Sequence, residues 1–168
     1  MQPYLITYNE AHTLARKMSV HVENDKIDVF IREAEDMDIK PVLGDSLLLA
    51  VKANPSRFQT LLNGGSYVDG MGRKKSISGL KSALSYFVYA RFVRNNDGNV
   101  TRVGFVNNNN DYSSRAMDSE RERAYNDSVA IGQRYLKECM EFVHCDDVCR
   151  ECCGMTEVKR GKYNVLGD

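Results

Sequence analysis

The chain has 168 residues, of which 42% are hydrophobic and 27% are charged, and its 23 lysines and arginines balance 23 aspartates and glutamates. This composition excludes the disordered and fibrous classes, and a net charge of zero argues against a general nucleic-acid binder, which normally carries excess basic residues. The length is typical of one domain, or of one domain with an appendage.

Two helices are predicted near the N-terminus. Thr7 and Glu10 have the spacing of a capping box, in which each side chain satisfies a free backbone N–H of the other residue. A second helix is expected to begin at Asn24. Its apolar residues recur with a period of 3.6 residues, at Ile27, Phe30, Ile31 and Ala34. Pro41 is expected to end or kink this helix, because proline disfavours the helical conformation of the residue before it.

The acidic residues of this second helix form a run: Glu33, Glu35, Asp36 and Asp38. Such a run is typical of a solvated outer face of an amphipathic helix. Two alternative interpretations are a docking face for a partner and a metal or acid–base site.

The middle of the chain predicts short helices followed by a loop. Residues 47–53 are expected to form a short buried helix, and a further helix starts at Pro55 and ends at the glycine pair 64–65. Residues 66–75 are expected to form a mobile glycine-rich loop. This loop carries a basic patch that could contact phosphate or an acidic partner: Arg73, Lys74 and Lys75.

The most apolar helix is predicted from Ser76 or Ser78 to about Arg94, and a long last helix from residues 114–118 to Val143. Between them, residues 100–106 favour a short strand or hairpin, and residues 107–114 are polar. Gly132 lies on the apolar stripe of the last helix, which a close approach by another helix would explain; a tolerated surface glycine is the alternative. Helical periodicity stops after Cys145, and residues 154–168 form a polar tail that is expected to be flexible.

We therefore predict an all-α fold: a single bundle of about five helices, with a long irregular or β-hairpin excursion (residues 95–116) before the last helix. The predicted organisation is a helical domain over residues 1–144 and a cysteine-containing tail over residues 145–168.

The five cysteines all lie within residues 139–153, too close together to staple a fold, which favours a reducing cytoplasm as the place of synthesis. A zinc site is the alternative, with four candidate ligands: His144, Cys145, Cys149 and Cys152. The apolar runs are shorter than the roughly 18–20 residues that span a membrane, and no secretory signal is visible. The three histidines lie in no nucleophile motif, and no phosphate-binding loop is present, so no enzymatic activity is expected.

Several segments in order resemble the helical head–tail connector proteins (adaptor or neck ring proteins) of tailed bacteriophages, most of all those of crAss-like phages. The segments are residues 25–27 (DKI), 30–35 (FIREAE), 38–44 (DIKPVLG), 61–67 (LLNGGSY) and 79–92 (GLKSALSYFVYARF), followed by 101–106 (TRVGFV) and 110–113 (NDYS). The resemblance spans roughly residues 4–143 and does not include the cysteine-rich end.

This resemblance implies a non-enzymatic virion protein without a cofactor. Such proteins form a ring, usually of twelve copies, that joins the portal at the capsid vertex to the next neck or tail ring and lines the channel through which DNA passes. It also implies that the excursion reaches the adjacent subunit, through Val103, Phe105, Val106, Asp111 and Tyr112. The alternative function is a small helical binding module stabilised by zinc.

Overall fold

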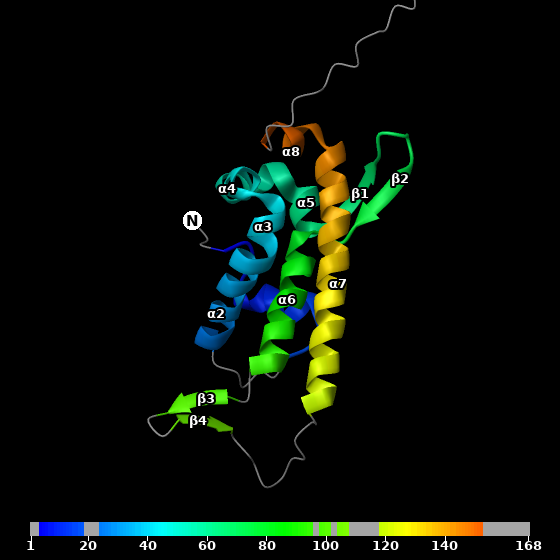
Figure 1. Ribbon diagram of the computed structural model, residues 1–168. Helices are drawn as coiled ribbons and strands as arrows, with labels where there is room; N and C mark the ends of the chain where they lie inside the picture. The colour runs from blue at the N-terminus through cyan, green and yellow to red at the C-terminus, as the bar shows by residue number, and fades with distance from the viewer. Residues whose placement is uncertain (1–3, 19–23, 96–97, 102–103, 108–117, 153–168) are drawn as a thin grey trace, which may run out of the picture.

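The computed structural model describes residues 4–18, 24–95, 98–101, 104–107 and 118–152. These residues are mostly helical, with two small β-hairpins (Figure 1), which confirms the all-α class. No helix in this part of the chain is both long and apolar enough to cross a membrane.

Helix α1 (Tyr8–Leu14) begins with the predicted capping box: the Thr7 hydroxyl accepts from the Glu10 N–H, and the Glu10 carboxylate accepts from the Thr7 N–H. Helix α2 (Asn24–Ala34) follows and continues through a π-helical turn, η1 (Glu35–Ile39), into α3 (Lys40–Leu43).

Pro41 does not end the second helix, but the regular α-helical geometry is interrupted just before it. The chain stays helical up to Gly44, whose φ of +78° stops it. The turn η1 widens the helix just before the proline, with the Lys40 N–H bonded to the Glu35 carbonyl five residues back. Pro41 then lies in the first turn of α3, a position that suits proline because its fixed φ is helical.

Short helices follow, as the sequence predicts: α4 (Asp45–Ala53), the 3₁₀ turn η2 (Pro55–Phe58) and α5 (Gln59–Asn63). The two longest helices, α6 (Leu80–Asn95) and α7 (Asp118–Cys145), run antiparallel and side by side, with α2 on the other side of α6 (Figure 1). One apolar core joins these helices, and its largest fully buried residues include Ile27, Ile31, Leu47, Leu61, Leu80, Leu84 and Val143.

The excursion between α6 and α7 contains the predicted hairpin. Strand β3 (Gly98–Thr101) pairs antiparallel with β4 (Gly104–Asn107), and Val100 lies opposite Phe105 in the register. Figure 1 shows this hairpin at the end of the molecule away from α8, clear of the helices.

Residues 66–75 do not form the predicted loop. Strand β1 (Gly65–Val68) pairs with β2 (Lys74–Ile77) in a second hairpin, whose inner side packs on α7 through the edge-to-face contact of Tyr67 with Phe142. Sequence patterns miss it because its strands have only four residues each and include glycine and lysine, which are depleted in strands.

Two glycines fix the base of this second hairpin. Gly64 and Gly79 have φ values of +85° and +87°, and their backbones cross in van der Waals contact. A Cβ on Gly79 would lie 2.4 Å from the Gly64 nitrogen and 2.6 Å from the Leu62 carbonyl oxygen. The direction of the hairpin therefore depends on both positions remaining glycine.

Helix α8 (Asp147–Cys152) extends the fold beyond the point where helical periodicity stops. Asp146 accepts the Cys149 N–H at its start, and Cys149 is buried in the common core near α4. Residues 145–152, which the sequence assigns to the tail, thus pack on the helices, whereas residues 154–168 lie outside the described part of the chain.

We predict that Gly79→Ala lowers the free energy of unfolding by roughly 3–5 kcal/mol, because the new Cβ meets backbone that cannot move aside. Gly72→Ala is the matched control: Gly72 has a similar φ of +80° but open space around it, so its loss is about 1 kcal/mol. Urea denaturation measures both values, and equal losses would show that the crossing does not constrain the fold.

Candidate interaction surfaces

The tip of the β1–β2 hairpin is a tightly bonded turn. One Asp69 carboxylate oxygen accepts the N–H groups of Met71 and Arg73, each at 2.9 Å, and the other accepts the Arg73 side chain at 2.8 Å. The hydrogen bond from the Arg73 N–H leads the interactions that hold the pKa of Asp69 below its ordinary value. Because Asp69 is itself buried within the turn, the tip has one defined shape rather than that of a mobile loop.

The predicted basic patch lies on this hairpin, but two of its three charges are already paired. Arg73 bonds to Asp69 within the turn, and Lys75 bonds to Glu141 on α7 at 2.9 Å. That side-chain hydrogen bond raises the pKa of Lys75 and lowers the pKa of Glu141. Lys74 is exposed and has no partner among the described residues, so it is the charge that remains available.

Apolar side chains accompany Lys74 at the tip, which the sequence analysis missed. Met71 is 80% exposed, and Val68 is also exposed. A methionine between two glycines in a turn gave the only local signal for this surface.

The acidic run of the second helix divides among three roles. Glu33 and Asp38 pair with Arg91 of α6, at 3.8 and 2.5 Å. Glu35 is only 2% exposed, contrary to its expected place on a solvated face: it accepts the Leu5 N–H at 2.8 Å and pairs with Lys52.

Asp36 is the member of the run that stays exposed and has no partner among the described residues. It borders a shallow hollow whose other lining residues are Lys40, Pro41, Gly44 and Asp45. Three exposed apolar residues belong to the same segment of η1, α3 and α4: Met37, Val42 and Leu49. The segment therefore exposes both acidic and apolar groups.

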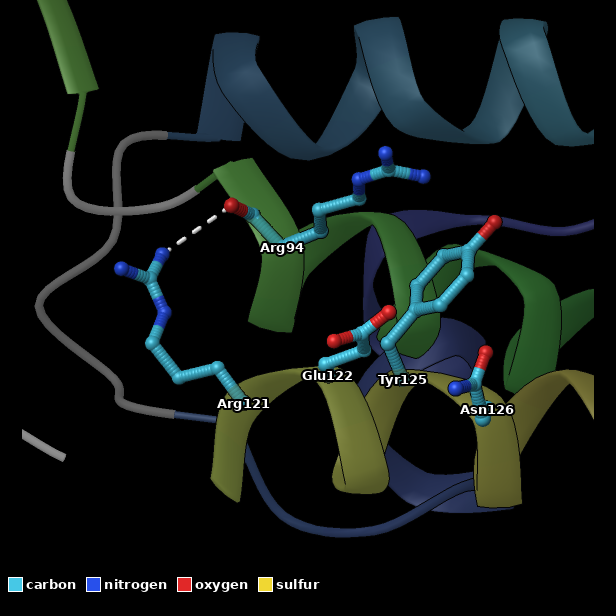
Figure 2. A pocket seen from close by; sticks show the side chains of 5 residues that line it. All are labelled: Arg94, Arg121, Glu122, Tyr125 and Asn126. Atoms are coloured by element: carbon cyan, nitrogen blue, oxygen red, sulfur yellow. Dashed lines mark hydrogen bonds between the residues drawn. The ribbon is translucent and has the colours of Figure 1, made fainter. Parts of the chain in front are cut away.

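A half-open pocket of about 370 Å³ lies at the root of the excursion, where α6 ends and α7 begins (Figure 2). Arg121 of α7 donates to the carbonyls of Arg94 (3.0 Å) and Val93 (3.4 Å) and so caps the end of α6. Arg94 in turn places its guanidinium 5.0 Å from the centre of the Tyr125 ring. These contacts hold together the two helix ends from which the excursion leaves and to which it returns.

The predicted subunit-interface residues are described only in part. Phe105 and Val106 lie in β4, whereas Val103, Asp111 and Tyr112 lie outside the described residues. Their expected role stays a prediction.

The predicted zinc ligands do not form a site in the described part of the chain, where no three potential ligands lie together. Cys149 is buried in the core, whereas Cys145 and His144 are exposed. Cys153 lies outside the described residues. The described donors thus do not come together around a metal ion.

A family model described as a family of unknown function (DUF6712) matches residues 39–145, so the chain belongs to this family. The match runs from the end of η1 to the end of α7 and includes both hairpins. No curated protein and no solved structure matches the chain.

We predict that Glu35→Gln lowers the free energy of unfolding by about 3 kcal/mol, because it leaves Lys52 without the buried carboxylate. Glu33→Gln is the control on the same helix: its carboxylate is half exposed, and its loss should be under about 0.5 kcal/mol. Thermal and urea unfolding test the pair. Glu35→Gln being as stable as Glu33→Gln would contradict the structural role of this ion pair.

We also predict that iodoacetamide labels Cys145 but not Cys139 in the native protein at pH 8. Burial raises the pKa of Cys139 to about 12, so its reactive thiolate is a fraction of roughly one in ten thousand. Mass spectrometry of the alkylated peptides measures the difference, and labelling in urea is the control that should reach both thiols. Rapid native labelling of Cys139 would place it outside the core.

Proposed function

We propose that this DUF6712 protein is a non-enzymatic virion component of a tailed bacteriophage. It would assemble as a ring, usually of twelve copies in the proteins it resembles, at the portal vertex of the capsid. The ring would join the portal to the next neck or tail ring and line the DNA channel. Most of the segments that carry the resemblance to connector proteins lie in or beside described helices and the β1–β2 hairpin: residues 25–27, 30–35, 38–44, 61–67 and 79–92.

The β3–β4 hairpin is the observation that carries the proposal. A two-stranded hairpin alone is at best marginally stable in water, because it has no apolar surface to pack on. This hairpin has no extensive contact with the described helices of its own chain. A neighbouring subunit would supply the missing contact.

The α6–α7 pair supports such an arrangement mechanically. The Arg121 cap ties the ends of both helices together at the root of the excursion, so the hairpin extends from a fixed point. Bundle helices of this kind would form the rigid wedge of a ring, and the excursion would be the arm that joins one wedge to the next.

The charge balance also suits a channel component. Several charges of this neutral chain lie in intramolecular pairs, among them Lys75–Glu141, Lys81–Glu10 and Arg91–Asp38. A surface without a large excess of positive charge would let DNA pass without binding it tightly, because affinity for DNA grows with the number of phosphates that lysine and arginine neutralise.

Electron microscopy of the full-length protein, alone and mixed with the portal protein of the same phage, tests the proposal. We expect rings that stack on the portal ring. The variant Phe105→Ser/Val106→Ser should keep the circular-dichroism melting curve of the wild type and lose the rings, whereas Val29→Ser, on the exposed side of α2, should keep them. Absence of both rings and portal complexes over a wide range of concentrations would refute the proposal.

A further inference from the structure

Most of the exposed large apolar side chains of the described residues belong to two segments of the chain. Of the seven such residues, five fall into two groups, and the other two are Leu14 and Val29. We call the first group, with its neighbouring charge, the tip patch: Val68, Met71 and Lys74. The second is the helix-face patch: Asp36, Met37, Val42 and Leu49. Grouping of this kind marks an interaction surface more often than scattered apolar residues do.

The backbone of the tip patch has a fixed conformation. Asp69 fixes the turn through its hydrogen bonds to Met71 and Arg73, and the Asp69 N–H bonds to the Arg73 carbonyl at 2.9 Å. Met71 is thus directed into solvent by a rigid turn. A preorganised contact loses little conformational entropy on binding, which favours association.

The two patches are complementary in charge as well as in apolar character. Lys74 on the tip patch and Asp36 on the helix-face patch are exposed, opposite in sign and without partners among the described residues. The neighbouring charges are already paired, Arg73 with Asp69 and Lys40 with Asp45. One unpaired charge of each sign remains for a contact between the patches.

The patches lie on opposite sides of the molecule, so they cannot meet within one chain. Figure 1 shows the β1–β2 hairpin on one side of α7 and helices α3 and α4 on the far side, at a similar level along the α7 axis. When copies associate through two different surfaces on opposite sides of the molecule, the contact is head-to-tail. Such a contact generates a ring when the rotation between copies closes.

We propose that the tip patch of one copy docks on the helix-face patch of the next. Met71 and Val68 cover Met37, Val42 and Leu49, and Lys74 pairs with Asp36. The inference rests on the proposed ring and adds a second contact between its subunits, besides the one through the β3–β4 hairpin. It also assigns Lys74 to a protein contact rather than to DNA.

Charge reversal of the full-length chain tests this contact. Lys74→Glu and Asp36→Lys should each weaken self-association about tenfold, as measured by analytical ultracentrifugation, because each places like charges opposite one another. The double variant Lys74→Glu/Asp36→Lys should restore it, since every junction again pairs opposite charges. An equimolar mixture of the two single variants should also assemble, with the variants alternating around the ring.

Reversals of exposed charges outside both patches, Lys17→Glu on the N-terminal segment and Asp28→Lys on α2, are the controls and should leave self-association unchanged. If rings form but Lys74→Glu assembles like the wild type, the docking contact is refuted and the ring proposal survives. If the wild type forms no assembly even with the portal, both are refuted. A Lys74→Glu effect confined to the binding of double-stranded DNA, measured by fluorescence anisotropy, would also overturn the contact.

Discussion

The close packing of α6 against α7 is the constraint on which the rest of the structure depends. A Cβ on Gly132 of α7 would lie 3.0 Å from the Phe87 ring of α6, tighter than ordinary contact, so the glycine lets the two helices approach. This pair carries the β1–β2 hairpin on one side and the α2–α4 segment on the other, and the β3–β4 hairpin projects from its end (Figure 1). The antiparallel pair thereby keeps the candidate surfaces apart.

Local signals predicted the elements that local interactions stabilise. The Thr7–Glu10 capping box, the helix over residues 47–53, the hairpin near residues 100–106 and the close approach at Gly132 all follow from neighbouring residues or simple periodicity. The sequence analysis missed features that depend on distant contacts. Glu35 is buried because Leu5 and Lys52 satisfy it, and α8 packs because Cys149 reaches the core near α4, although its Asp146 cap was a readable local signal.

The candidate surface was predicted only in composition. Both the basic residues 73–75 and the acidic run at 33–38 were recognisable, as was a docking role for the acidic run. The sequence did not reveal which of these charges are unpaired, because their intramolecular partners, such as Glu141 and Arg91, lie on helices far along the chain. Lys74 and Asp36 are exposed and have no partner among the described residues. They place opposite charges on two sides of the molecule, which the net charge of zero does not reveal.

The central claim is that copies of this chain join through two different faces. Carbodiimide cross-linking tests it directly, because the reagent joins a lysine to a carboxylate only when they are in contact. Assemblies prepared from equal amounts of ¹⁴N- and ¹⁵N-labelled protein should yield a Lys74–Asp36 cross-linked peptide, with half of the product containing one partner of each isotope. Cross-links between copies that connect only other surfaces, or Lys74–Asp36 peptides without mixed isotopes, would contradict the account.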